Sequence, residues 1–463
     1  MRAAHCTDGH RTDANARKDA TMKHWFPLLG LLFLLPPGAK AADVDTRDVQ
    51  AGGTAVGDLV RIPVKAQKIN EFISMASGLS FMYLIETDEG NILIDTGFAH
   101  HAKPQADALE AIIEERPVTH IILPQGQHDD VGGIPFWKDD DTKIVMTRAA
   151  YEYMPWRKQI APFLAHRFVT LYDWAAQLDE ERFPFEPIEP DLIVEQDSVL
   201  KFEQGGVELE VIPLPGAEGK NSAGVYLPQH KILFVGGGVL GPVFPMWPNL
   251  GTVRADRDRS LDAYLASLEK LRALDIELIL AGNHAPIAGK EKIETGLAQI
   301  HGALTFVRGE VIEGMNQGKD VYQLMREIRL PEEYADLDQS HGRVEWTIRQ
   351  LVNDYGGWFR YRQTSELYPW HVEEVYPDVV AAAGGSTKLL DAAQARLAAG
   401  QPVQAMQLVE IVRSVDAEDA RAIALEREVL GQLLAAAQAG KGSFSEIAWI
   451  QSRLRKLPAP PES

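Results

Sequence analysis

The spacing of hydrophobic positions indicates β-strands in the first part of the chain. Val207, Leu209 and Val211 alternate with charged residues, and apolar positions two apart are typical of a half-exposed strand. An acidic pair followed by Gly90 predicts a hairpin turn between two such strands. Strands are predicted at residues 81–86, 91–94, 120–123, 143–147, 207–212 and 231–235.

From residue 260 onward the apolar positions take the period of a helix. Leu261, Leu265 and Leu268 fall on one face of a helix that we predict between residues 260 and 274. The alanine-rich helices beyond it resemble tetratricopeptide-like packing, although no fixed repeat period is present. Further helices are predicted at residues 297–327, 343–354 and 387–439, the last broken at 400–402 and 414–419 into antiparallel hairpins.

Strands mixed with covering helices predict a layered α/β or α+β domain over residues 42–295, and we take the α+β class as the prediction. An α-helical domain is predicted over residues 296–456. The 463 residues suit two or three domains, and 45% hydrophobic with 24% charged residues is a globular composition. The net charge of −20 repels phosphate polymers and anionic lipids, so nucleic acid is not an expected partner.

Residues 22–41 have the features of a secretory signal, with a basic start, an apolar run and small residues ending at Ala41. The run is too short to span a bilayer, so we expect a periplasmic or secreted protein cleaved near Ala41, and the alternative is a buried core helix. Residues 1–21 are polar and unpatterned, which favours Met22 as the start over an N-terminal extension. Cys6 is the only cysteine, so the mature chain would hold no disulfide and no thiolate ligand.

A strand ending in Asp95-Thr96-Gly97, followed later by "PQGQHDDVGG", carries a resemblance to the metallo-β-lactamase superfamily. That family has a loop of the form HxHxDHxGG. Imidazoles two apart on an extended loop share one zinc ion there, while the Asp and the following His reach a second. The resemblance implies an αβ/βα sandwich. Registered on the two glycines, the four ligand positions here are Gln125, Gln127, Asp129 and Asp130, and only Asp129 matches.

The segment 213–238 resembles the alkyl sulfatase branch of that superfamily. Glu218 stands ten residues before a proline, as a metal-ligating Glu does in the family. The bridging acid of the family falls on Gly237, which has no side chain to offer. The last metal ligand falls on His284, with Asn283 as the alternative if the register shifts by one residue.

Helical segments at residues 315–334, 343–359 and 383–400 are similar to the alkyl sulfatase dimerisation region. The resemblance therefore implies a homodimer formed through the helical domain. Asn249 and Arg254 match the family positions that face the sulfate, and the planar guanidinium suits a tetrahedral anion. The alternative for Arg254 is a surface ion pair with Asp256 or Asp258.

A two-ion hydrolase of this family needs about seven ligating side chains, which this sequence does not supply. Asp129, Asp130 and His284 are instead expected to form a reduced centre for one zinc, manganese or iron ion, whose bound water would be the nucleophile. A metal-free state is the alternative. On that alternative Asp129 and Asp130 cap a turn, Glu218 is a loop acid, and His284 is a hydrogen-bonded turn residue.

Other candidates are predicted to be structural. Asp95 is expected to fix its loop through backbone hydrogen bonds. His100, His101 and His128 are expected to be solvated. Aromatic residues between 346 and 361 are expected in a helical core or a dimer interface rather than a substrate pocket.

Two functions remain open from the sequence. The first is an exported hydrolase for a sulfate ester or related ester, in which Asp129, Asn249 and Arg254 act on the substrate. The second is a non-catalytic binding or scaffold protein that keeps the fold and the dimer. The losses at Gln125 and Gln127 favour the second, and the retained metal-ligand and sulfate-facing positions favour the first.

Overall fold

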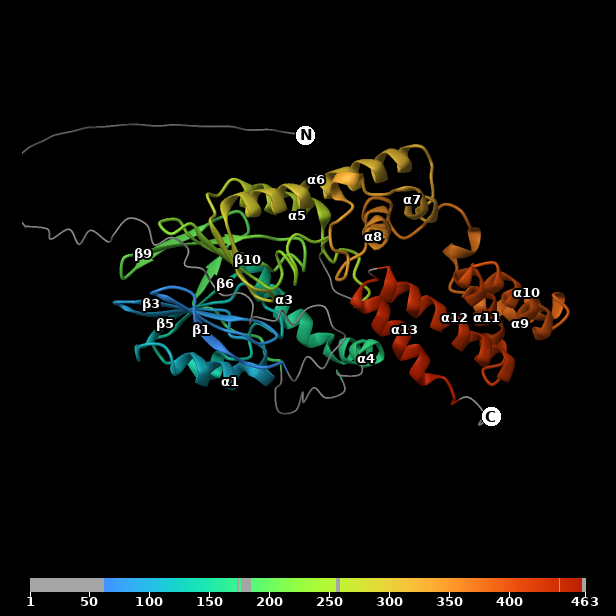
Figure 1. Cartoon of the computed structure of the whole chain (residues 1–463), viewed down its shortest axis with the longest axis horizontal. Coiled ribbons are helices and arrows are strands. Elements are labelled where there is room, and N and C mark those ends of the chain that lie inside the picture. The colour runs from blue at the N-terminus through green and yellow to red at the C-terminus, as the bar shows by residue number, and fades with distance from the viewer. Residues whose placement is uncertain (1–61, 173–174, 176–184, 255–258, 441, 460–463) are drawn as a thin grey trace, which may run out of the picture. The chain divides into compact units, whose positions relative to one another are not determined.

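The computed structural model describes residues 62–172, 175, 185–254, 259–440 and 442–459 (Figure 1). The predicted signal over residues 22–41 and the segment 1–21 lie outside these ranges. Within the described ranges, no helix combines the length and the apolar character needed to cross a bilayer.

The first sheet contains seven strands that lie side by side in chain order. β1 to β4 pair antiparallel and β4 to β7 pair parallel. The two-residue turn between Thr87 and Gly90 confirms the predicted hairpin. The strands are β1 (Ala66–Lys68), β2 (Ile73–Ala76), β3 (Met82–Thr87), β4 (Gly90–Ile94), β5 (Val118–Ile122), β6 (Lys143–Thr147) and β7 (Leu192–Val194).

The second sheet contains six strands in the order β13-β12-β11-β10-β9-β8. Its central β11 and β12 pair parallel, and its other neighbours pair antiparallel. The strands are β8 (Leu200–Gln204), β9 (Val207–Pro213), β10 (Ala223–Leu227), β11 (Ile232–Gly236), β12 (Leu278–Ala281) and β13 (Ile287–Ala288).

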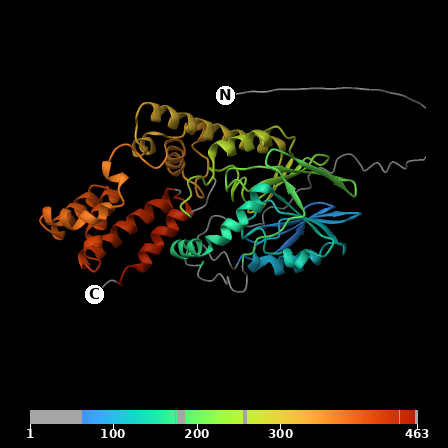
Figure 2. The same cartoon turned by 180° about the vertical axis from the view of Figure 1, so that it is seen from behind.

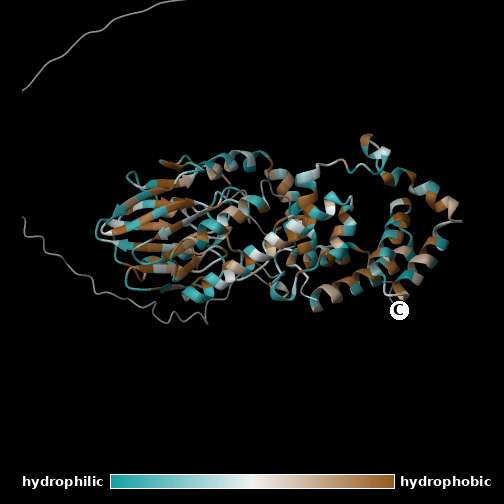
Figure 3. Ribbon diagram, turned by 90° about the horizontal axis from the view of Figure 1, so that it is seen from above, coloured by the Kyte–Doolittle hydropathy of each residue, from teal (hydrophilic) through white to brown (hydrophobic). Residues whose placement is uncertain are grey.

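The two sheets face each other, and helices cover both outer faces, which confirms the predicted α+β sandwich. Side chains such as Ile92 from the first sheet and Phe234 from the second share one buried cluster. The strands that contribute to this core are largely hydrophobic in Figure 3. The helices of this part are α1 (Ala99–Glu110), α2 (Ile134–Trp137), α3 (Arg148–Gln159), α4 (Ala161–Leu171) and α5 (Leu261–Arg272).

The rest of the chain is helical, as predicted (Figure 2). The predicted boundary at residues 295 and 296 lies inside α6, and the predicted helix over 297–327 is interrupted at Gly318, whose φ is 76°. The breaks near residues 400 and 416 are confirmed. The helices are α6 (Lys290–Asn316), α7 (Val321–Glu327), α8 (Val344–Gly356), α9 (Tyr376–Ala382), α10 (Ser386–Ala398), α11 (Pro402–Val415), α12 (Ala420–Ala439) and α13 (Phe444–Lys456), with short 3-10 turns η4 (Glu332–Tyr334), η5 (Thr364–Leu367) and η6 (Val372–Val375).

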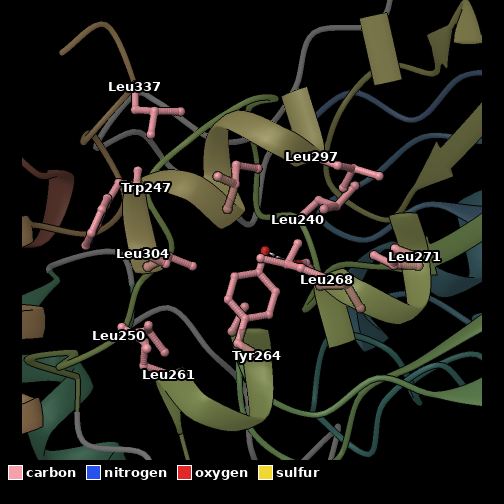
Figure 4. Close-up of a cluster of buried hydrophobic side chains, with 14 of the residues drawn as sticks. Leu240, Trp247, Leu250, Leu261, Tyr264, Leu268, Leu271, Leu297, Leu304 and Leu337 are labelled. Carbon is pink, nitrogen blue, oxygen red and sulfur yellow. Dashed lines mark hydrogen bonds between the residues drawn. The ribbon is translucent and has the colours of Figure 1, made fainter. Parts of the chain in front are cut away.

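A cluster of large buried side chains anchors the segment that carries Asn249. Trp247 and Leu250 pack with Tyr264 of α5 and with leucines of α6 (Figure 4). Trp247 Nε1 also donates a hydrogen bond of 3.0 Å to Thr347 Oγ1 of α8. Because the residues on both sides of Asn249 are buried in this way, its backbone position is set by the core.

Candidate anion and metal site

The loops that carry the predicted site residues meet where strands of both sheets end. Glu218 N donates to Gly238 O at 3.0 Å, which joins the β9–β10 loop to the end of β11. Gly282 N donates to Gly236 O at 2.7 Å, which joins the end of β12 to the same place. The hydrogen-bonded loops therefore bring residues from distant parts of the sequence into one site.

Glu218 is buried and is bound by three other side chains. Its Oε2 lies 2.6 Å from Arg259 Nη2 and 3.2 Å from Arg254 Nη2. Its Oε1 lies 2.9 Å from Nε2 of His341, in the loop before α8. We call these four residues the arginine cluster.

The charges of the arginine cluster decide the ionisation of its members. Burial alone would raise the pKa of Glu218, but Arg259, His341 and Arg254 outweigh it and hold that pKa well below its usual range. Burial lowers the pKa of His341, against the opposing effect of its contact with Glu218. At neutral pH the cluster therefore holds one carboxylate, two guanidinium groups and a neutral imidazole that donates from Nε2.

Asn249 lies beside the arginine cluster with an unused amide. Arg259 Nη1 donates to the backbone carbonyl of Asn249 at 2.8 Å. The side chain of Asn249 is 1% exposed, and neither its nitrogen nor its oxygen has a hydrogen-bond partner among the described residues. Nδ2 of buried Asn221 likewise has no hydrogen-bond partner among the described residues. Buried polar groups of this kind cost about 1–3 kcal/mol each when nothing satisfies them, so they favour a polar ligand.

Three acids form what we call the acid cluster: Asp95, Asp129 and Asp130, of which Asp129 interacts electrostatically with Arg254. Asp95 has a φ of 66°, and its Oδ1 accepts a hydrogen bond of 2.7 Å from Gly97 N, so it fixes its turn as predicted. Oδ2 of Asp95 and Oδ2 of Asp130 are buried and have no hydrogen-bond partner among the described residues. Buried carboxyl groups without donors favour the neutral, protonated form.

Burial raises the pKa of Asp95 to about 7, and the charge of Asp129 adds to that effect. The pKa of Asp130 is raised well above its usual value by burial and by the charges of Asp95 and Asp129. Burial also raises the pKa of Asp129, although Arg254 opposes it. Burial therefore favours the protonated forms of the acids in the acid cluster.

The two glutamines at the predicted imidazole positions bind protein groups. Gln125 is buried, and its Nε2 donates to Ser222 Oγ at 3.0 Å. Gln127 Nε2 donates to the backbone carbonyl of Glu218 at 3.1 Å. Both side chains thus hold loops together.

The space of the missing bridging acid is filled. A Cβ on Gly237 would lie 2.0 Å from Oδ1 of Asn283. Asn283 is itself held in place, because its Nδ2 donates to Leu79 O at 2.8 Å. Asn283 therefore occupies the room that a side chain at residue 237 would need.

His284 keeps one feature of a metal ligand. Its Nδ1 lies 2.7 Å from the carbonyl oxygen of Ala285, so Nδ1 carries the proton and donates. Its Nε2 is buried and has no partner among the described residues. A ring fixed by a carbonyl at one nitrogen, with the other nitrogen bare, is how metal-binding histidines are commonly oriented.

The donor set does not fit the two-ion centre of the family. Gln125, Gln127 and Glu218 are engaged with protein groups, and Gly237 supplies no oxygen. In the part of the chain that the structure describes, no three His, Cys, Asp or Glu side chains are grouped so as to hold a metal ion. The described donor set therefore does not supply the ligands of a two-ion hydrolase.

The histidines near the site are not solvated in the way that the sequence predicts. His101 is 3% exposed, and its Nδ1 accepts a hydrogen bond from Leu79 N, because it lies on the buried face of α1. His100 stacks on Phe98 with ring centroids 4.7 Å apart. His128 packs edge-on against the same ring. The expectation was wrong for His101, whereas His100 and His128 are partly exposed and pack against an aromatic ring.

Sequence reasoning missed Arg259 and His341. Arg259 stands five residues after Arg254, so a second cation near the first was visible, but no spacing rule linked either to Glu218. His341 is 123 residues away from Glu218 in the chain. The Asp residues weighed as partners of Arg254 lie outside the described residues, and the described partner is Glu218.

Two family models match the chain. The metallo-beta-lactamase superfamily model matches residues 77–284, and the alkyl sulfatase dimerisation model matches residues 320–444. This chain belongs to the alkyl sulfatase branch of the metallo-β-lactamase superfamily. The predicted family is thereby confirmed.

Similar proteins of this branch come from Pseudomonas sp. A linear primary-alkylsulfatase is 24% identical over 357 residues, which cover 73% of this chain and 67% of the relative. An (R)-specific secondary-alkylsulfatase is 24% identical over 384 residues, covering 76% and 56%. The solved structure of a stereoselective inverting sec-alkylsulfatase matches with a TM-score of 0.73 at 21% identity, over 86% of this chain and 66% of that one. This chain thus spans between about half and two thirds of the length of these relatives.

Proposed function

We propose that this protein binds the anionic head of a sulfate-type monoester at the arginine cluster. The observation that carries the proposal is the convergence of Arg254 and Arg259 on the single carboxylate of Glu218. The cluster therefore keeps more positive than negative charge, in a chain whose net charge is −20. A local cationic site in an acidic protein favours an anionic ligand.

The unsatisfied groups beside the cluster support the same ligand. Nδ2 of Asn249, Nδ2 of Asn221 and Nε of Arg254 are buried donors without a partner among the described residues. A sulfate head offers several acceptor oxygens in a tetrahedral arrangement, and charge-assisted hydrogen bonds are the strong ones. The relatives, both alkylsulfatases, support a sulfate ester as the ligand class.

Calorimetric titration with hexyl sulfate tests the proposal, with hexanol as the uncharged comparison. We expect hexyl sulfate to bind and hexanol to bind much more weakly. Arg254→Lys should weaken hexyl sulfate binding at least about tenfold, because an ammonium lacks the planar fork of donors. Equal binding of both probes, or no effect of Arg254→Lys, would refute the proposal.

Hydrolysis of the bound ester at a single metal ion is the second candidate. His284 favours it, because its bare Nε2 is oriented as in a metal ligand, and Asp129 and Asp130 are the other proposed ligands. In the purified protein this candidate predicts about one zinc, manganese or iron per chain, with turnover of an aryl sulfate that a chelator abolishes. Metal-free protein with no turnover would reject hydrolysis, and only the binding function would remain.

We further propose that the protein is an exported homodimer. Trp358 and Trp370, both 71% exposed, and Tyr361, 85% exposed, lie in the region matched by the dimerisation model. Exposed aromatic residues are characteristic of association surfaces. Their exposure excludes these side chains from a helical core, which was the alternative location expected for the aromatic residues between 346 and 361. Light scattering should show a dimer that Trp358→Ser with Trp370→Ser converts to monomer, whereas Val403→Ser, on another exposed face, should not. Export rests on the predicted signal, and N-terminal sequencing of the mature protein checks it.

A further inference from the structure

We propose that Phe444 is a positioning residue that holds the arginine cluster in its ligand-binding geometry. The inference rests on the proposed binding function and adds a residue that no sequence motif identified. Phe444 is the first residue of α13 and stands more than a hundred residues from every other member of the site.

The ring of Phe444 contacts two members of the arginine cluster directly. It stacks on His341, with ring centroids 5.1 Å apart and an interplanar angle of 11°. The guanidinium carbon of Arg254 lies 5.7 Å from the centroid of the same ring. A third aromatic ring, Tyr172, stacks on Phe444 at 5.9 Å and 14°. The flat face of Phe444 therefore limits the orientations of both the imidazole and the guanidinium.

Backbone and side-chain hydrogen bonds fix Phe444 itself. Its backbone N donates to Ser340 O at 2.7 Å, next to His341. The neighbouring Ser445 Oγ shares a buried hydrogen bond of 2.7 Å with the hydroxyl of Tyr172. One residue further, Glu446 lies 3.0 Å from Nη1 of Arg343. The start of α13 is thus tied to the segments on both sides of the site.

The other end of α13 is anchored on α12. Arg453 of α13 lies 2.7 Å from Glu426, a carboxylate that is 2% exposed and that also binds Arg413 of α11. Ser452 Oγ donates to Thr170 O of α4. Because α13 is held at both ends, it is a rigid support for the ring of Phe444.

These contacts form a short series that ends at the anion-binding groups. Phe444 orients the ring of His341, which donates to Glu218, and Glu218 holds Arg254 and Arg259. Loss of the ring therefore frees His341 to turn and lets the guanidinium of Arg254 move. Phe444 is not needed to contact the ligand for this effect.

The test compares Phe444→Leu with Phe168→Leu in the full chain. Phe168 is a matched control because it packs in the same small hydrophobic cluster and against the same Tyr172. Among the described residues, no ring contact joins Phe168 to His341 or Arg254. We expect Phe444→Leu to weaken hexyl sulfate binding about tenfold and Phe168→Leu to leave it within about twofold. Phe444→Tyr keeps the ring and should restore binding.

Hydrogen exchange separates this inference from the proposed function. We expect Phe444→Leu, but not Phe168→Leu, to speed amide exchange in peptides that contain Arg254 or His341. If the wild type does not bind hexyl sulfate but exchange changes as expected, the binding function fails and the positioning role stands. If Phe444→Leu and Phe168→Leu behave alike in exchange and in affinity, or Phe444→Tyr fails to restore binding, the positioning role is overturned.

Discussion

The arginine cluster and the acid cluster bury charge in the same site by opposite means. In the arginine cluster a single carboxylate, Glu218, is surrounded by cations and its pKa falls. In the acid cluster, burial raises the pKa of Asp95 and the pKa of Asp130. The comparison shows that neighbouring cations keep one buried carboxylate ionised, whereas burial favours the protonated form of Asp95 and Asp130.

The difference also separates the two functional candidates within one site. The arginine cluster is complete as a protein structure and presents donors to an anion. The acid cluster contains Asp129 and Asp130, which with His284 are the proposed metal ligands. Each of the following substitutions tests one part of this comparison.

The largest effect is expected from removing a cation of the arginine cluster. Arg259→Met leaves Glu218 buried with less compensation, and breaking a buried ion pair costs about 3–5 kcal/mol. Urea unfolding should show that loss in the free energy of unfolding. Arg308→Met is the matched control, because Arg308 pairs with Asp262 at the surface and such pairs contribute at most about 1 kcal/mol. Similar losses for the two variants would contradict the account of the arginine cluster.

A steric effect of intermediate size tests whether Asn283 occupies the room beside Gly237. Gly237→Ala should cost about 1–3 kcal/mol, because its Cβ forces Asn283 away from the hydrogen bond to Leu79. Adding Asn283→Ala should recover part of that loss, so that the double variant is more stable than the two single changes predict by addition. Strict additivity would mean that Asn283 does not occupy the room beside Gly237.

A third effect, a pH dependence of stability, arises in the acid cluster. The folded pKa of Asp95, about 7, exceeds the unfolded value of about 3.9, so the folded state holds the extra proton between those values. The associated stability is fully present below about pH 4 and is lost as the pH rises towards 7, by up to about 1.4 kcal/mol per pH unit.

Asp130→Asn should flatten this dependence, because it removes a carboxyl group whose own raised pKa contributes to the same slope. Chemical unfolding at a series of pH values between 4 and 8 measures it. Asp140→Asn, a change at an exposed acid, is the control and should leave the slope unchanged. An unaltered slope in Asp130→Asn would place the titrating proton elsewhere.

Local sequence patterns predicted the strands of the sandwich well. Residues 143–147 form a strand with the predicted bounds, and the helix breaks near residues 400 and 416 lie where Gly, Pro and Asp occur. The retained and missing positions of the metal loop were equally visible, because Gln125 and Gln127 stand two apart before the paired glycines. These features depend on neighbours a few residues apart, which the sequence displays directly.

Only the tertiary structure showed which residues bind the carboxylate of Glu218 and fill the room beside Gly237. Glu218 finds its partners at Arg254, Arg259 and His341, and Asn283 fills the room beside Gly237. These pairs join segments up to 123 residues apart, and their distances depend on how two sheets and a helical region pack. Residue type determined which groups were present, whereas burial and long-range contacts determined their charge, because a pKa depends on desolvation and neighbours that no spacing rule encodes.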